Sequence, residues 1–300
     1  MGKFYIGHLC YKGTDYYGWQ KQADVPTIQE TLFNTFRELY PLGRIDVKAT
    51  SRTDRNVHAL AQVVKFLLPR RVDAEEVRLK INEALPSNLH FSQLERINKS
   101  FKVTYLSLYK EYVYFFSPEK VPFNFVGHID DPRFDLEKVK EAAKLYCGKH
   151  DFTYFQHRSQ VGGDMVRNIL ESKIVKASEI FNEGPFQDYP IYCFFVRGEG
   201  FLKQMVRLMM GTLIKCGIGE CSLDDIKTAL LGKSDDCDYR KPGYIVPGHG
   251  LFLKHIEFPE VFSGDQLRRV VDKELYKKCF PQFELWLDDE PQSFDIIDLD

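Results

Sequence analysis

The sequence SRTDRNVHA, at residues 51–59, separates two apolar segments. The apolar segments, 45–50 and 61–68, contain β-branched and aromatic side chains, so each predicts a strand and the polar segment predicts the loop between them. On this loop Asp54 lies between Arg52 and Arg55, whose positive charge favours an ionised carboxyl group. An ionised carboxylate on a loop can act as a nucleophile, although an Asp that only bonds the backbone of its own turn gives the same pattern.

Strands and helices are predicted on both sides of this loop. In the first half, strands are predicted at 3–11 and 105–116, and helices follow the capping residues Thr27 and Asp73. A segment rich in Pro, Gly and Asp, 117–133, leads to a similar second half. Its predicted elements are helices within 136–146, 202–213 and 222–232 and strands at 171–177 and 191–198. This mixture favours an α+β fold with two similar subdomains, 1–120 and 121–258, followed by an extension, 259–300.

Charge is unevenly distributed along the chain. The net charge is −2, but residues 281–300 hold seven acidic groups and no Lys or Arg, which indicates a loosely ordered acidic tail. Residues 44–71 hold seven basic groups against only Asp46 and Asp54. Such a local excess can attract phosphate, although a solvated charged face would give the same composition.

Several classes of protein are disfavoured by what the sequence lacks. The seven cysteines form no CxxC pair, so neither a zinc site nor a disulfide framework is indicated. The run 211–219 lacks the pattern of a P-loop. We therefore expect no metal and no cofactor. The N-terminus has no long apolar run, which predicts a cytoplasmic protein with no membrane span.

Residues 51–59 resemble the signature of the TruA family of tRNA pseudouridine synthases, which reads S/G-R-T-D-x-G-V-H-A. Further segments resemble motifs of the same family in the same order: 11–20 (YKGTDYYGWQ), 27–29 (TIQ), 81–86 (INEALP), 110–114 (KEYVY), 151–153 (DFT), 201–207 (FLKQMVR) and 250–251 (GL). Several specific motifs in order are stronger evidence than any one of them.

The resemblance implies two ferredoxin-like subdomains that form one extended, mostly antiparallel sheet with helices and a central RNA-binding cleft. It implies isomerisation of uridine to pseudouridine in the anticodon stem-loop of tRNA, at positions 38 to 40, by a homodimer without a cofactor. A uridine within a stem must leave the stack before it can react, at a cost of a few kcal/mol.

The resemblance also assigns roles to individual residues. Asp54 would be the catalytic carboxylate, and its attack on C6 of the base or on C1′ of the sugar stays open. Arg207 would pair with it, and Tyr112 would stack under the target base. Arg52 would support the flipped nucleotide, and three further residues are predicted RNA contacts: Arg55, His58 and Lys110. Without the family, Arg207 fits an exposed helix Arg, Tyr112 a half-buried strand residue and His58 a structural His.

Two segments depart from the family pattern. Asn56 replaces the usual Gly of the signature, and because Asn tolerates a positive φ, the same tight turn is predicted. Residues 246–250 match only loosely the family's late A-P-x-x-G segment. A non-catalytic RNA-binding module is the competing interpretation, because residues 197–202 superficially resemble an RRM motif. Glu199, however, occupies the place of a stacking aromatic residue there.

Overall fold

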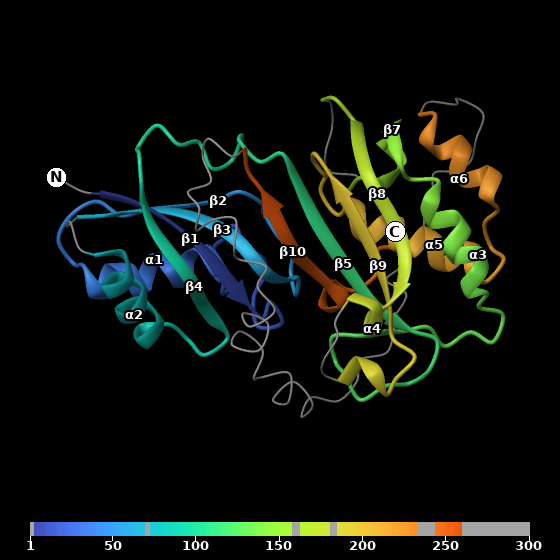
Figure 1. Cartoon of the computed structure of the whole chain (residues 1–300), viewed down its shortest axis with the longest axis horizontal. Coiled ribbons are helices and arrows are strands. Elements are labelled where there is room, and N and C mark those ends of the chain that lie inside the picture. Colours follow the sequence, from blue (N-terminus) through green and yellow to red (C-terminus); the bar gives the residue numbers. More distant parts are fainter. Residues whose placement is uncertain (1–2, 70–72, 158–162, 181–184, 233–243, 260–300) are drawn as a thin grey trace. The chain divides into compact units, whose positions relative to one another are not determined.

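The computed structural model describes residues 3–69, 73–157, 163–180, 185–232 and 244–259. Within these ranges the chain forms two compact units: unit 1 comprises 3–110 and 252–259, and unit 2 comprises 111–251. Each unit combines strands with helices, which confirms the α+β class (Figure 1). The acidic tail predicted at 281–300 lies outside the described residues.

The sheet of unit 1 is built around β3 (His58–Leu68), which begins where the Asp54 loop ends. β1 (Lys3–Tyr11) pairs antiparallel with β3 along its length, and β4 (Leu89–Ile97) pairs antiparallel with β1. Two strands share the other edge of β3. β2 (Asp46–Ala49) pairs antiparallel with residues 64–67, and β10 (Leu251–Glu257) pairs parallel with the first two residues of the strand. The start of β3 is therefore held by a strand from much later in the sequence.

An aromatic cluster connects the helices of unit 1 to its sheet. Helix α1 (Ile28–Leu39) begins at Thr27, whose side chain accepts a hydrogen bond from the backbone N–H of Glu30, as the spacing predicted. The helix places Phe36 with its ring centre 4.7 Å from that of Phe66 on β3. The ring centre of Phe66 in turn lies 5.7 Å from those of Tyr5 on the adjacent strand β1 and Phe91 on the next strand, β4, and all four rings are buried. Burial of this apolar area stabilises the sheet on which the loop depends.

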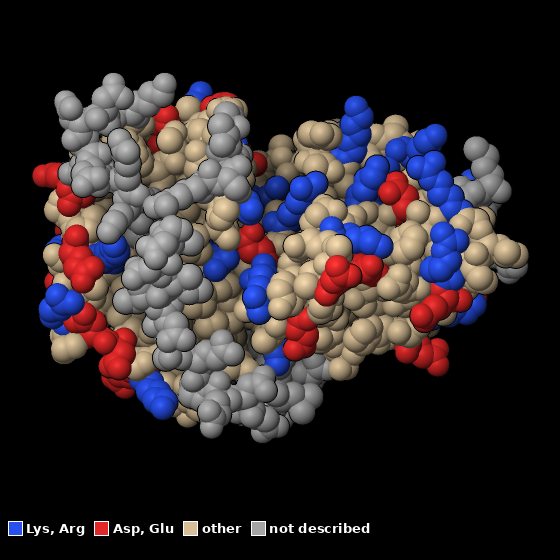
Figure 2. All heavy atoms as spheres, turned by 180° about the vertical axis from the view of Figure 1, so that it is seen from behind, with Lys and Arg blue, Asp and Glu red and all other residues tan. Residues whose placement is uncertain are grey.

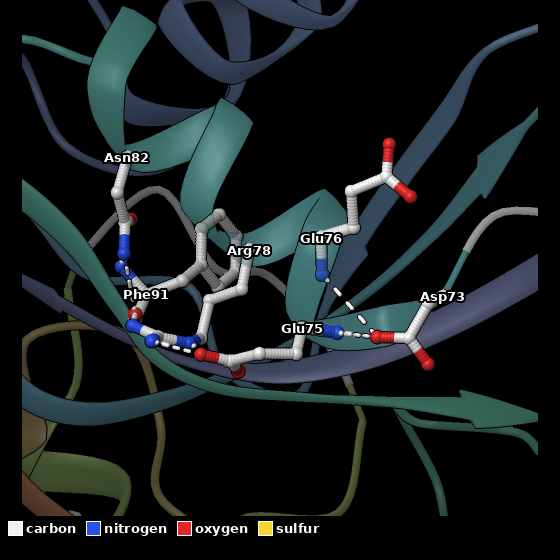
Figure 3. A network of polar contacts seen from close by, with 6 residues as sticks. All are labelled: Asp73, Glu75, Glu76, Arg78, Asn82 and Phe91. Atoms are coloured by element: carbon white, nitrogen blue, oxygen red, sulfur yellow. Dashed lines mark hydrogen bonds and ion pairs between the residues drawn. The ribbon is translucent and has the colours of Figure 1, made fainter.

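Helix α2 (Ala74–Ala84) is fixed at its first turn and again near its end (Figure 3). The Asp73 carboxylate accepts hydrogen bonds from the backbone N–H groups of Glu75 and Glu76, which confirms the predicted helix start. Farther along, Asn82 exchanges two hydrogen bonds of 2.8 Å with the backbone of Phe91 on β4. The amide side chain thus replaces a strand neighbour and joins the helix to the sheet.

In unit 2 the strand order is β5 (Tyr109–Ser117), β9 (Tyr192–Gly198), β8 (Val166–Lys176) and β7 (Gly148–Asp151), with β6 (Gly127–His128) parallel to β5. β7, β8 and β9 pair antiparallel. Its helices are α3 (Leu136–Lys144), the short α4 (Ala177–Ile180), α5 (Met205–Gly217) and α6 (Leu223–Leu230). Helix α5 is buried almost throughout, so any polar side chain that it holds must be accommodated in the interior.

The predicted strand at 105–116 starts four residues later, at Tyr109, because Tyr105 closes a turn by donating its N–H to the carbonyl of Lys102. Strands β4, β6, β7 and β10 were not predicted. β4 lacks a regular alternation of apolar residues, because its pairing with β1 shifts register between His8 and Leu9.

A buried histidine predicts how the stability of unit 1 depends on pH. His8 on β1 is 2% exposed, and burial, with a smaller contribution from His255, lowers its pKa from 6.5 to about 3. Above pH 7 both folded and unfolded chains hold this histidine neutral. As the pH falls through 6.5, the unfolded chain takes up the proton and the folded chain does not, so the free energy of unfolding decreases.

Between pH 7 and pH 5 this one group should remove about 2 kcal/mol from the free energy of unfolding. Urea unfolding at the two pH values measures the loss, which His8→Leu should reduce. His90→Leu is the matched control, because His90 is exposed and its pKa is lowered less. Equal acid sensitivity of wild type and His8→Leu would contradict the prediction.

Candidate active site

The Asp54 loop is held from one side by residues 13–19, which follow β1. Thr53 accepts a backbone hydrogen bond from Trp19 (3.0 Å), and the N–H of Asn56 donates to Tyr16 (3.2 Å). Gly18, at φ +94°, packs so closely that a Cβ on it would lie 2.6 Å from the carbonyl oxygen of Thr53. Asp54 therefore lies between two backbone attachments, which hold the backbone of the loop on both sides of it.

The two ends of the loop are held from within unit 1. Gln62, fully buried on β3, accepts from the backbone N–H of Ser51 and donates to its carbonyl oxygen at 2.8 Å. His58 is 1% exposed; its Nδ1 accepts from the N–H of Gly13 at 3.1 Å, and its ring stacks on Phe252 of β10 at 4.4 Å. The ring of His58 therefore supports the loop from the interior and is not available at the surface for a contact with RNA.

Two arginines face solvent on either side of the half-buried Asp54. Arg52 and Arg55 are exposed, and within the described residues neither forms an ion pair; the guanidinium of Arg55 lies 4.2 Å from the ring centre of Tyr17. Figure 2 shows Lys and Arg side chains interspersed with Asp and Glu side chains on the face drawn there. Cations without an acidic partner favour the binding of anionic groups.

Asn56 has the left-handed conformation that its place in the signature predicted. Its φ is +63°, and the carbonyl of Asp54 accepts a hydrogen bond from the N–H of Val57 across the turn (3.2 Å). Gly adopts this conformation without steric cost and Asn at a small one. The substitution of Asn for Gly therefore preserves the turn that displays Asp54.

We expect Asn56→Gly to remain active and Asn56→Val to lose roughly five- to thirtyfold in rate, because a β-branched residue at this φ costs roughly 1–2 kcal/mol. Pseudouridine formation and a melting curve should be measured together. Asp24→Val is the matched control, because Asp24 has φ +61° in a different, exposed loop. It should lose similar stability and keep its activity, whereas full activity of Asn56→Val would refute the role given to the turn.

In unit 2, Arg207 lies near the start of α5 and is 9% exposed. Its Nε donates to the carbonyl oxygen of Val246 at 2.7 Å, so the loose motif at 246–250 positions this guanidinium. Burial, and then the charge of Arg207, lower the pKa of His249 to about 4, which keeps that neighbour neutral at pH 7. Gly250 allows close packing, because a Cβ there would lie 2.5 Å from the ring of Tyr114.

Tyr112 and Lys110 lie two residues apart on β5. Tyr112, in unit 2, is 6% exposed and contacts the ring of Phe201 edge-on at 5.0 Å. Lys110 belongs to unit 1; its Nζ approaches the carbonyl of Thr50 at 3.5 Å, and burial lowers its pKa. The Lys110 ammonium thus lies next to the residue that precedes the Asp54 loop.

Several supporting residues were missed at the level of sequence. Gln62 could have been noticed as a polar residue in an apolar strand, but nothing local marks His249 as a neighbour of Arg207. Within the described ranges, no cluster of His, Cys, Asp or Glu is arranged to hold a metal ion. In the same ranges, no helix combines the length and the apolar character needed to cross a membrane.

Comparison with known proteins gives a consistent result. Residues 10–105 and 142–259 match a family model described as tRNA pseudouridine synthase. The chain is 32% identical to tRNA pseudouridine synthase A of Bacillus subtilis over 254 residues, which cover 83% of this chain and 97% of the relative. It is also 32% identical to the protein of that name from Phytoplasma mali, with 83% of this chain and 96% of the relative covered. The chain therefore belongs to the tRNA pseudouridine synthases, a family of isomerases.

Proposed function

We propose that this chain converts uridine to pseudouridine in tRNA with Asp54 as the nucleophile. The observation that supports it most is the position of this carboxylate, half-buried on a loop that backbone hydrogen bonds fix on both sides. A positioned nucleophile gains rate because its orientation is set before the substrate binds. Asp54 is also flanked by two exposed guanidinium groups that can receive the RNA backbone.

The chemistry requires no oxidant or reductant, because uridine and pseudouridine are isomers. The bond between C1′ and N1 breaks, a bond between C1′ and C5 forms, the C5 proton leaves and N1 gains a proton. Asp54 forms the transient covalent bond at C6 or at C1′ and is released at the end. We therefore propose that the enzyme uses neither metal nor cofactor.

Arg207 and Tyr112 complete the proposed machinery, on the strength of the family motifs that they match. The guanidinium of Arg207 is buried and oriented by Val246, and a buried cation is stable when a carboxylate compensates it. On the strength of the family resemblance, we propose Asp54 as the carboxylate that pairs with Arg207. Tyr112 would stack on the flipped uracil, and its hydroxyl would receive or relay the proton from C5.

The RNA would be bound by Arg52, Arg55 and Lys110, with Arg52 supporting the stack from which the uridine leaves. The family resemblance supports the anticodon stem-loop, positions 38 to 40, as the target, a homodimer as the active form and the cytoplasm as the location. His58 contributes by holding the loop, through its bond from Gly13 and its stacking on Phe252.

The test is incubation of the full chain with unmodified tRNA transcripts, followed by mapping of pseudouridine. We expect modification at positions 38 to 40, with and without EDTA, provided that the tRNA stays folded. Binding of tRNA without any pseudouridine would favour a non-catalytic RNA-binding protein. If pseudouridine forms only at other positions, the proposed activity stands but the proposed positions of modification are wrong.

A further inference from the structure

Tyr17 is an exposed aromatic residue beside the Asp54 loop. The side chain is 39% exposed, whereas its neighbours Tyr16 and Trp19 are 6% and 2% exposed. Tyr16 donates its hydroxyl to Asn88, and Trp19 is among the largest fully buried side chains. Burial and an internal hydrogen bond thus explain why Tyr16 and Trp19 are aromatic, but they do not explain the aromatic side chain of Tyr17.

The ring of Tyr17 has one contact that points to a function. The guanidinium of Arg55 lies 4.2 Å from the ring centre, and within the described part of the chain the ring has no aromatic partner. In the same part of the chain, the guanidinium of Arg55 has no hydrogen bond or ion pair. A guanidinium group stacked on a ring keeps its N–H donors, which lie in its own plane and remain able to bind an anion.

The backbone fixes this pair relative to Asp54. The N–H of Tyr17 donates to Pro26 (2.9 Å), and its carbonyl accepts from the side chain of Gln22 (2.9 Å). The carbonyl of Tyr16 accepts a hydrogen bond from the N–H of Asn56, and the N–H of Trp19 donates one to the carbonyl of Thr53. The backbone at Tyr17 is therefore fixed to the same turn that carries Asp54, so little backbone entropy is lost when this residue binds a ligand.

We propose that Tyr17 and Arg55 together bind one unstacked nucleotide of the RNA, adjacent to the uridine that reacts. The base stacks on the ring of Tyr17, and the guanidinium of Arg55 binds a phosphate. Aromatic rings accept any base in this way, and planar guanidinium groups match phosphate geometry. The inference rests on the proposed function in taking tRNA as the ligand, and it adds Tyr17 as a binding residue.

The experiment measures the dissociation constant of the full chain for an unmodified tRNA transcript, and the single-turnover rate at saturating enzyme. Loss of one stacked base corresponds to about tenfold weaker binding, which we expect for Tyr17→Leu. Tyr17→Phe, which keeps the ring, should recover most of that affinity. Tyr105→Leu is the matched control, because Tyr105 is an even more exposed tyrosine, at 82%, and should bind tRNA as wild type does.

A double variant tests the pairing itself. If one nucleotide contacts both side chains, Tyr17→Leu combined with Arg55→Gln should weaken binding by less than the product of the two single effects. If the effects of the two substitutions on the dissociation constant multiply, the two side chains do not contact the same nucleotide and the proposal of a shared contact is wrong. If Tyr17→Leu and Tyr105→Leu lose the same affinity for tRNA, the effect is general and the proposal is overturned. If Tyr17→Leu reacts more slowly but binds tRNA with unchanged affinity, the effect is purely structural and the proposal is likewise overturned.

Failure of this inference can be distinguished from failure of the proposed function. The dissociation constant needs no turnover, so the comparison among the variants stands even if the wild-type chain forms no pseudouridine. Conversely, if the wild-type chain modifies tRNA while Tyr17→Leu binds tRNA as tightly as wild type does, the proposed function stands and Tyr17 is not a binding residue.

Discussion

Asp54→Asn should reduce pseudouridine formation by at least roughly 10⁴-fold while the dissociation constant for tRNA changes little, because removal of a nucleophile costs a large part of the rate enhancement. Asn occupies almost the same volume, so the hydrogen bonds that hold residues 53 and 56 can persist. The amide oxygen is a poor nucleophile, and the amide also lacks the negative charge that we assign to a pairing with Arg207. Single-turnover assays and a tRNA binding curve measure the two effects separately.

Asp46→Asn is the matched control for this variant. Asp46 is the other acid of the basic stretch 44–71, it lies on β2 of the same unit, and its carboxylate is 3.4 Å from the ammonium of Lys48. This partly exposed ion pair contributes little to stability, so the variant should fold and react as wild type does. A rate for Asp54→Asn within a factor of a few of wild type would refute the proposed mechanism.

Arg207→Gln should lower the single-turnover rate by roughly 10²–10³-fold, the usual effect of removing one positioned donor or charge from an active site. Gln can still approach the carbonyl of Val246, but it has no charge to offer a carboxylate. Arg207→Lys keeps the charge without the planar geometry, so an intermediate rate is expected. The two variants together distinguish the role of the charge from that of the shape.

A structural loss could produce the same fall in rate, because Arg207 is buried and bonded at 2.7 Å to Val246. Melting curves therefore accompany the assay. Arg133→Gln is the control in the same unit: its side chain is 60% exposed and pairs with Asp131 at 2.6 Å on the surface. The proposal fails if Arg207→Gln melts as wild type does and reacts within threefold of it.

The sequence predicted features that local chemistry determines. Thr27 and Asp73 begin helices because their side chains accept from nearby N–H groups, and this pattern is visible over three residues. The positive φ of Asn56 followed from its place where the family has Gly. Each of these predictions depended on residues that are close together in the chain.

Features that depend on distant pairing were not predictable in this way. The burial of His58 depends on Phe252, and the position of Arg207 depends on the carbonyl of Val246, whose residue type contributes nothing to the bond. Strand β4 was missed because the register shift opposite His8 and Leu9 breaks its alternation. Pairing across long stretches of sequence leaves no periodic signal within either partner.

The parallel pairing of β10 with the start of β3 determines when the Asp54 loop can form during synthesis of the chain. Phe252 is paired with His58 across nearly two hundred residues of chain, so this contact closes a very long loop and forms slowly. Ribosomes add residues in order, and the rest of unit 1 emerges long before β10 does. A nascent chain that stops before residue 252 therefore lacks the stacking partner of His58. The loop that presents Asp54 reaches its final form only when almost the whole described chain has been made.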